Sequence, residues 1–378
     1  MSNGASRAAS TFAWGLFCAS SWTWCIGMFL PLLLLGIFGA ESFWIFAIPN
    51  VIGCTAFGYV ITAQRSKALV ETHAPALKLF AFVTIAFQVF FLGYGSSLML
   101  FSEGSTIADT WPVLGIVLTM AAAALATSRR GDRFWLGFAI AATVAAVVLF
   151  INLMNFTGGF PIVPTPEDAP SLAAATPLLV LGFLLCPYLD PTFHRARQTT
   201  PSRHSFFVFG IVFSGMLIFV SATFDPETLS ALVLPIVFAQ WMIQLVFTAG
   251  AHLRELAELP RALFGANLAC LAALTLGVVL GLPSVSDERI YLVFLGLYTI
   301  PFPLYVLTTL VAGPSRPLPP QAVVAILVVS VALAPLGWLG FVEETTPLLL
   351  WAFGTVCVAG SMIGLMSRKA NLVLEPST

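Results

Sequence analysis

The sequence predicts an all-α integral membrane protein with about twelve transmembrane helices. Of its 378 residues, 59% are hydrophobic and only 9% are charged, whereas an average soluble domain has about 25% charged residues. Stretches of about 20 apolar residues recur along the whole chain, and each can cross a hydrocarbon core about 30 Å thick. The basic residues fall almost entirely in alternate loops, as expected for a chain that crosses a membrane many times.

Twelve apolar segments account for these crossings. We expect them at residues 12–38, 42–63, 76–101, 106–127, 133–155, 171–189, 204–223, 229–253, 261–281, 290–312, 320–341 and 346–366. With the N-terminus placed in the cytoplasm, fifteen of the sixteen Lys and Arg residues lie on the cytoplasmic side, and Arg289 is the exception. This distribution obeys the positive-inside rule. We therefore expect a multi-pass protein of the plasma (inner) membrane with both termini in the cytoplasm.

The first ten segments form two halves of nearly equal length. Spans one to five cover 144 residues and spans six to ten cover 142 residues. Because each half has an odd number of spans, the second half enters the membrane from the opposite side, which is the arrangement of an inverted repeat. The predicted organisation is a first five-helix repeat at 1–156, an outer connector at 157–170, a second, inverted repeat at 171–313, and two C-terminal helices with a short cytoplasmic tail at 314–378.

The first span of each half contains residues that disfavour a continuous helix. Span one carries the polar and aromatic stretch FCASSWTWCIG at 17–27, and span six ends in LGFLLCPYLDP at 181–191. Unwound backbone at membrane depth is tolerated only where it lines a protein cavity, and it then supplies groups that bind a solute or an ion. We therefore predict that both spans are broken in the membrane around a polar cavity.

Span eight carries a polar residue at every fourth position, namely Gln240, Gln244, Thr248 and His252. This spacing places all four on one helical face, and we expect that face to point into the bundle. Together with polar residues of spans one and three, the stripe predicts a substrate site between spans one, three, six and eight. Its candidate residues are Ser20, Ser21, Trp24, Gln88, Gln240, Gln244 and Thr248.

Charged and metal-binding residues are scarce within the spans. Asp190 directly precedes Pro191 at the end of span six, where we expect it to cap a helix or to lie at the membrane interface. The four histidines fall at or near the cytoplasmic face without metal-ligand spacing, so no metal site is predicted. The six cysteines are expected to be buried free thiols. Because no catalytic constellation is present, we do not expect an enzyme.

Three stretches resemble the sodium/solute symporter family. They are ASSWTWCIGM at 19–28, LGFLLCPYLDPTFHRARQ at 181–198 and TAGAHLRELAEL at 248–259, the last with Arg254 and Glu255 in the place of the family's RD pair. The resemblance covers most of residues 12–312. It implies the LeuT-like five-plus-five inverted-repeat fold, followed here by two C-terminal helices.

The chain departs from this family at the sodium site. In the family, sodium is held by backbone carbonyls at the break in the first core helix and by a Ser/Thr pair in the eighth, sixteen residues before the acidic residue of the RD pair. Counting back from Glu255 gives Ala239 and Gln240, and a hard cation needs several oxygen ligands. The resemblance thus implies a degenerate sodium site near Phe17, Ser20, Ala239 and Gln240. Sodium coupling is left in doubt, and no other cofactor is expected.

Two functions fit the sequence. The first is a secondary transporter of a small organic solute by alternating access, whose partners are the solute and the lipid bilayer, with no role for nucleic acid. The second is a transporter-like membrane sensor or a structural subunit of a membrane complex. The second function would involve a membrane-protein partner or a homo-oligomer.

Overall fold

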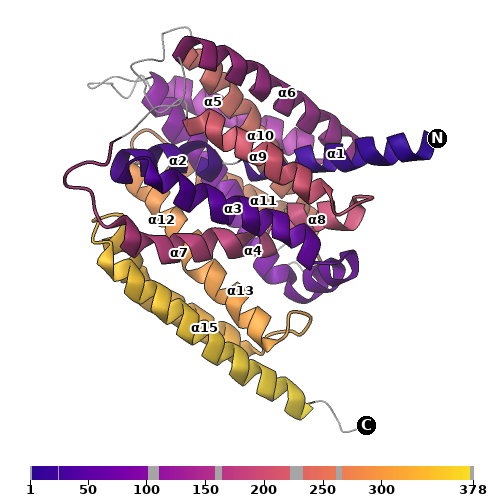
Figure 1. The fold of residues 1–378 in the computed structure, drawn as a ribbon, viewed down its shortest axis with the longest axis vertical. Coiled ribbons are helices and arrows are strands. Elements are labelled where there is room, and N and C mark those ends of the chain that lie inside the picture. The colour runs from indigo at the N-terminus through magenta and orange to yellow at the C-terminus, as the bar shows by residue number, and fades with distance from the viewer. Residues whose placement is uncertain are drawn as a thin grey trace.

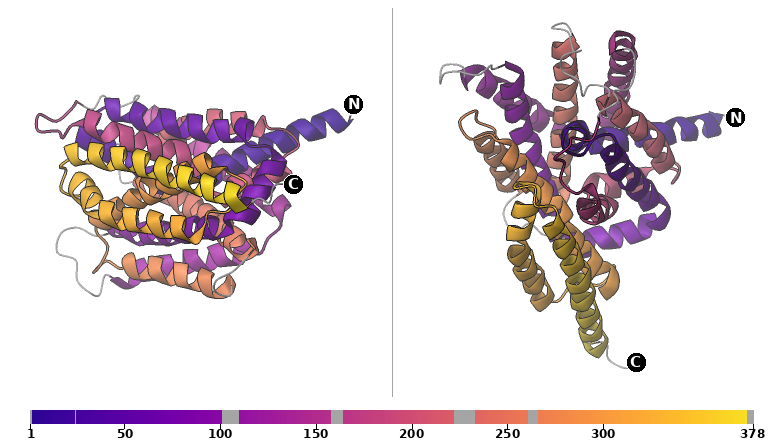
Figure 2. Two further views of the ribbon diagram at one scale, coloured as in Figure 1. Left: turned by 90° about the horizontal axis from the view of Figure 1, so that it is seen from below. Right: turned by 60° about the vertical axis from the view of Figure 1, so that its left-hand side comes forward.

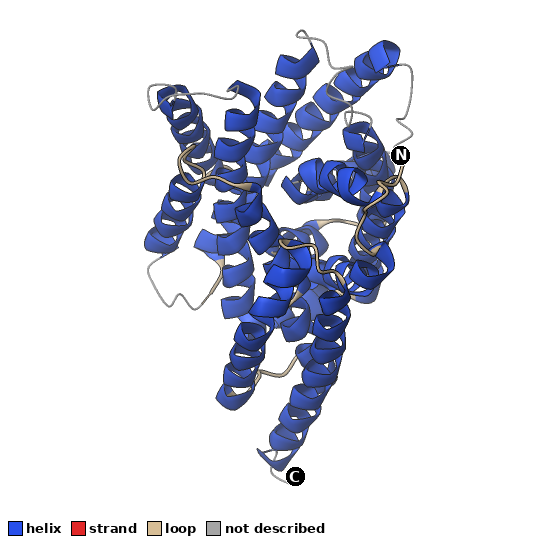
Figure 3. Cartoon of the chain, turned by 90° about the vertical axis from the view of Figure 1, so that its left-hand side faces the viewer, coloured by secondary structure: helices blue, strands red, loops and turns tan. Residues whose placement is uncertain are grey.

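The structure is a computed structural model that describes residues 2–23, 25–100, 110–157, 164–221, 233–260 and 266–374. Its regular elements are helices throughout these ranges (Figure 3). They are α1 (Ser2–Trp22), α2 (Cys25–Phe38), α3 (Glu41–Val60), α4 (Ala63–Leu100), α5 (Thr110–Ser128), α6 (Asp132–Thr157), α7 (Leu172–Leu185), the 3₁₀ turn η2 (Cys186–Tyr188), α8 (Pro191–Thr199), α9 (Ser205–Ser221), α10 (Val233–Glu258), α11 (Ala266–Leu280), α12 (Glu288–Thr299), α13 (Pro301–Ala312), α14 (Pro320–Phe341) and α15 (Pro347–Leu374).

Each of the twelve predicted ranges overlaps one helix or two consecutive helices. By length and composition, seven of the described helices can cross a membrane, and up to nine can do so if each of two bent helix pairs counts as one span. The first helix begins and the last helix ends at the same end of the bundle (Figure 2), as an even number of crossings requires. The protein is therefore an all-α, multi-pass membrane protein, and the total of twelve spans remains a prediction.

Spans one and six are broken, as predicted. Helices α1 and α2 meet at an angle of 57°, and α7 with η2 meets α8 at 48°. The second break follows from two prolines that cannot donate a backbone hydrogen bond: Pro187 lies in the 3₁₀ turn, and Pro191 is the first residue of α8. The predicted span at 171–189 matches α7 with η2, and α8 continues the chain beyond the break from Pro191 to Thr199.

The helices form two groups that meet at the breaks. In one group α3 packs against α2, α7 and α9, and α9 also packs against α1. In the other, α4 packs against α5, α10 and α11. Contacts of α1 with α10, and of α8 with α4 and α10, join the groups. Helices α13 and α14 pack against α15, which lies along the lower edge of the bundle (Figure 1).

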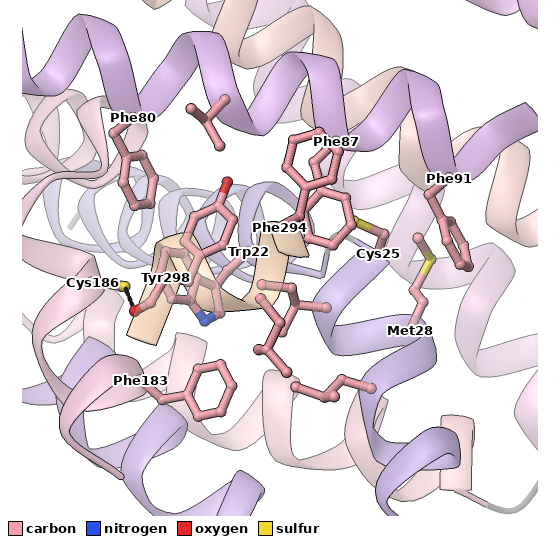
Figure 4. Packing of buried hydrophobic residues seen from close by; sticks show 14 of the residues in the cluster. Trp22, Cys25, Met28, Phe80, Phe87, Phe91, Phe183, Cys186, Phe294 and Tyr298 are labelled. Carbon is pink, nitrogen blue, oxygen red and sulfur yellow. Dashed lines mark hydrogen bonds between the residues drawn. The ribbon is translucent and has the colours of Figure 1, made fainter. Parts of the chain in front are cut away.

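Aromatic side chains enclose the region around the breaks (Figure 4). Phe87 of α4 stacks on Phe294 of α12, with ring centroids 4.4 Å apart. Trp22, at the end of α1, donates a hydrogen bond from Nε1 to Asn50 Oδ1 over 2.9 Å. The Cys186 thiol donates to the Tyr298 carbonyl over 3.2 Å. This packing separates the unwound backbone from lipid, which is the condition for breaking a helix inside a membrane.

Gly93 of α4 lies against Gly281, the residue that follows α11. A Cβ atom added to Gly93 would lie 2.1 Å from the Gly281 carbonyl oxygen. We expect Gly93→Ala to lower the free energy of unfolding by about 1–3 kcal/mol, because the helices must separate. Gly115→Ala on α5, where an added Cβ meets nothing within 4 Å, is the control and should not destabilise the protein. If Gly93→Ala and Gly115→Ala change the midpoint of thermal unfolding in detergent equally, the close contact between Gly93 and Gly281 is contradicted.

Candidate transport site

The end of α1 presents a backbone carbonyl to α10. Because α1 stops at Trp22, the carbonyls of its last turn have no partner within the helix. The Ser20 carbonyl instead accepts hydrogen bonds from Gln244 Nε2, at 2.5 Å, and from Thr248 Oγ1, at 3.3 Å. All three residues are buried. Two residues of the polar stripe on α10 thus hold the first break in place.

The start of α2 is held by two other helices. The first backbone N–H groups of a helix also lack partners within it, and the Cys25 N–H donates to Gln88 Oε1 of α4 over 3.3 Å. The Tyr291 hydroxyl of α12 donates to the Cys25 carbonyl over 3.1 Å. Gln88 Nε2 is buried and has no hydrogen-bond partner among the described residues. Gln88 therefore fixes the break and also keeps one polar group available.

The two breaks are connected through Asp190 and Thr192. Asp190 is the N-cap of α8, and its Oδ1 accepts hydrogen bonds from the Thr192 backbone N–H and hydroxyl, each at 2.7 Å. The same hydroxyl lies 3.0 Å from Ser21 Oγ of α1. The predicted capping role of Asp190 is thus confirmed. Its side chain is fully buried beside the first break.

The polar stripe of α10 faces the bundle, as predicted. Gln240, Gln244, Thr248 and His252 are at most 4% exposed, because their common face lies against other helices of the bundle. His252 is fully buried, and its Nε2 lies 3.8 Å from Asp190 Oδ2. Its predicted position at or near the cytoplasmic face stays a prediction.

The structure brings five of the predicted site residues together around the breaks: Ser20, Ser21, Gln88, Gln244 and Thr248. Trp24 lies outside the described residues. Gln240 is buried on α10, one turn before Gln244, and its Oε1 has no hydrogen-bond partner in the described part of the chain.

The residues named for a sodium site are more dispersed. Ala239 is exposed, and Phe17 packs 5.7 Å from the Arg254 guanidinium. The α10 side chains that reach the Ser20 carbonyl are Gln244 and Thr248, one and two turns beyond Gln240.

Sequence reasoning missed Thr192 and Tyr291. Each is a single polar residue that contacts the breaks only through the tertiary structure. No periodic pattern marked either one.

The space at the breaks is small in this conformation. Trp22, Asn50, Cys186 and Tyr298 line a cavity of about 10 Å³, which holds about one water molecule. A second cavity, of about 200 Å³, lies beside Arg195, Gln198 and Glu255 at the ends of α8 and α10. The breaks are therefore enclosed, and a solute can reach them only if helices move.

A cluster of charged residues joins α6, α8 and α10 beside the larger cavity. Arg195 of α8 pairs with Glu255 and Glu258 of α10. Arg254 pairs with Glu255 at 3.1 Å and with Asp132 of α6 at 3.0 Å, and it is only 3% exposed. We call these five residues the ion cluster. It lies at the end of the bundle that the charge pattern predicts to be cytoplasmic.

Comparison with known proteins identifies the fold. No protein-family model and no curated protein sequence matches the chain. The structure of a Na+-coupled sialic acid symporter, in a substrate-bound outward-open state, superposes with a TM-score of 0.56, covering 97% of this chain and 90% of that one at 16% identity. The structure of a manganese transporter from Eremococcus coleocola superposes less well, with a TM-score of 0.43 at 11% identity over 97% of this chain and 94% of that one. The predicted all-α transporter fold is confirmed, because the chain shares the fold of this symporter structure, and the five-plus-five inverted repeat stays a prediction.

Proposed function

We propose that the protein is a secondary transporter that moves a small organic solute by alternating access. The observation that carries this proposal is the meeting of two broken helices at a buried polar centre within a transporter fold. Helix ends at such breaks present partial charges, positive at the N-termini of α2 and α8 and negative at the C-terminus of α1. They can orient a polar solute without a charged side chain.

The unpartnered polar atoms favour a solute rich in hydroxyl or amide groups. Ser20 Oγ, Gln88 Nε2 and Gln244 Oε1 are buried and lack hydrogen-bond partners among the described residues. A buried polar group without a partner costs about 1–3 kcal/mol. A solute with several neutral donors and acceptors would offset that cost when the helices separate to admit it.

The ion cluster fits the role of a gate in this scheme. Arg195 joins α8, which follows the second break, to Glu255 and Glu258 of α10. Separating α8 from α10 would break both pairs and open the path from the larger cavity. We place this gate at the cytoplasmic face of the plasma (inner) membrane, with both termini in the cytoplasm. On this proposal the chain is a distant relative of the sodium/solute symporters.

The hydrogen bonds at the first break disfavour sodium binding there. A cation would need the lone pairs of the Ser20 carbonyl, which accepts hydrogen bonds from Gln244 Nε2 and Thr248 Oγ1. An amide nitrogen donates hydrogen bonds and cannot ligate a cation. We therefore propose that transport does not depend on sodium at this position.

Uptake by purified protein in liposomes tests the proposal. The probes are radiolabelled sugars, amino acids, nucleobases and sialic acid, the last taken from the symporter of similar fold. We expect uptake of at least one compound above the level of protein-free liposomes, with no requirement for sodium. No uptake of any probe, together with stable co-purification of a membrane-protein partner, would instead favour the structural-subunit function. A strict sodium requirement would contradict the ion assignment.

A further inference from the structure

A buried acid and a buried base face each other at the second break. Asp190 and His252 are both fully buried. Asp190 Oδ2 lies 3.8 Å from His252 Nε2, and neither atom has a hydrogen-bond partner among the described residues. His252 Nδ1 also lacks one there. An ionised carboxylate in such surroundings is stable only if it is paired or protonated.

One proton neutralises the charge of the pair. It can reside on the imidazole, which then pairs with the carboxylate, or on the carboxyl group beside a neutral imidazole, and in either case it neutralises the single negative charge of the pair. The 3.8 Å separation is longer than a hydrogen bond of 2.7–3.2 Å. A small movement of α8 toward α10 would therefore let the shared proton form a direct bond.

The surrounding titratable groups do not compete for this proton near neutral pH. Cys18 of α1, Cys54 of α3, Cys186 of η2 and Tyr298 of α12 are close enough to sense the charge of Asp190. Thiols and phenols ordinarily keep their protons at neutral pH. Glu255 of α10 also senses Asp190, but it is paired with Arg195 and Arg254. His252 packs against the apolar ring of Phe80 from α4.

We propose that Asp190 and His252 form a proton-binding site, and that its occupancy controls the contact between the two broken helices. This inference rests on the proposed transport function only for its role in coupling. The path to the first break is direct, because Asp190 Oδ1 accepts from the Thr192 hydroxyl, which lies 3.0 Å from Ser21 Oγ. Protonating the carboxyl weakens the charge-assisted hydrogen bond that it accepts from the Thr192 hydroxyl, and so changes the hydrogen bond between this hydroxyl and Ser21 of α1. The proton thereby replaces sodium as the coupling ion.

Infrared difference spectroscopy of the full-length protein in liposomes tests the site without knowledge of the solute. Spectra are taken between about pH 8 and about pH 5, the range in which an imidazole titrates. We expect a C=O stretching band of a protonated, buried carboxylic acid that is lost in Asp190→Asn and altered in His252→Gln. Asparagine also caps helices, so α8 should remain folded. Asp287→Asn removes an exposed N-cap carboxyl at the start of α12 and is the matched control.

The outcomes separate this proposal from the proposed function. We expect an isotope label in the aspartate carboxyl groups to shift the band in the wild-type protein. This measurement needs no substitution, so it does not depend on a variant that folds. A band unchanged by the label or by Asp190→Asn would overturn the proton site, even if solute uptake is found. If the band behaves as expected and no solute is transported, the proton site stands and the transport function fails. Uptake that is equally fast with and without a pH gradient, in both the wild type and Asp190→Asn, would overturn the coupling role.

Discussion

Glu255→Gln is expected to lower the free energy of unfolding by about 3–5 kcal/mol, because it removes one charge from a buried ionic network. Glu255 is only 5% exposed and pairs with both Arg195 and Arg254. Its replacement leaves the Arg254 guanidinium, itself 3% exposed, with Asp132 as its remaining acidic partner within the described part of the chain. The midpoint of thermal unfolding in detergent, or steric trapping in bicelles, measures the loss.

Glu258→Gln is the matched control for this prediction. Glu258 lies on the same helix and pairs with the same Arg195, but its side chain is 57% exposed. Exposed ion pairs contribute about 0–1 kcal/mol, so the control should unfold close to the wild type. If both substitutions destabilise the protein equally, burial does not determine the strength of the ion cluster, and its proposed role as a gate loses its physical basis.

Gln244→Leu is expected to reduce the initial rate of solute uptake by about tenfold or more. The substitution removes the 2.5 Å hydrogen bond to the Ser20 carbonyl and leaves only the longer contact from Thr248. A buried carbonyl that loses its partner costs about 1–3 kcal/mol, and about 1.4 kcal/mol corresponds to a factor of ten. The same side chain also carries one of the unpartnered oxygens assigned to the solute.

Ile243→Leu is the control for Gln244→Leu. Ile243 precedes Gln244 on α10, and it is 37% exposed on another side of the helix. The initial rate of solute uptake by Ile243→Leu should match that of the wild type. Wild-type uptake by Gln244→Leu, measured with the compound that the liposome assay identifies, would contradict the assignment of the first break to the transport site.

Much of the fold followed from the sequence, because membrane insertion imposes simple rules. The length of apolar segments and the distribution of basic residues predicted helices at every span position. Breaks in spans one and six followed from residues such as Pro187 and Pro191, which disfavour helix interiors. The spacing of Gln240, Gln244, Thr248 and His252 predicted a face that is indeed buried. These features depend on local sequence, and local sequence was sufficient for them.

The sequence could not reveal contacts that join distant segments. Asp190 was expected to cap a helix or to lie at the membrane interface, but the sequence did not indicate that this cap lies beside His252 and, through Thr192, beside the first break. Helix α8 begins at Pro191, and both Asp190 and His252 are fully buried. Counting residues back from Glu255 likewise led to the exposed Ala239. The angle and position at which α10 crosses α1 determine which turn of α10 contacts α1. The spacing of residues along α10 alone does not predict this crossing.

The central claim is that the broken helices move relative to α10, so that the ion cluster opens and closes. Pulsed electron paramagnetic resonance tests it directly, with spin labels at Thr199, the last residue of α8, and Ala257 near the end of α10, both of which are exposed. We expect two distance populations, with the longer one enriched by Arg195→Gln and the balance shifted by the transported solute. A single distance that neither Arg195→Gln nor the solute changes would contradict alternating access around these breaks.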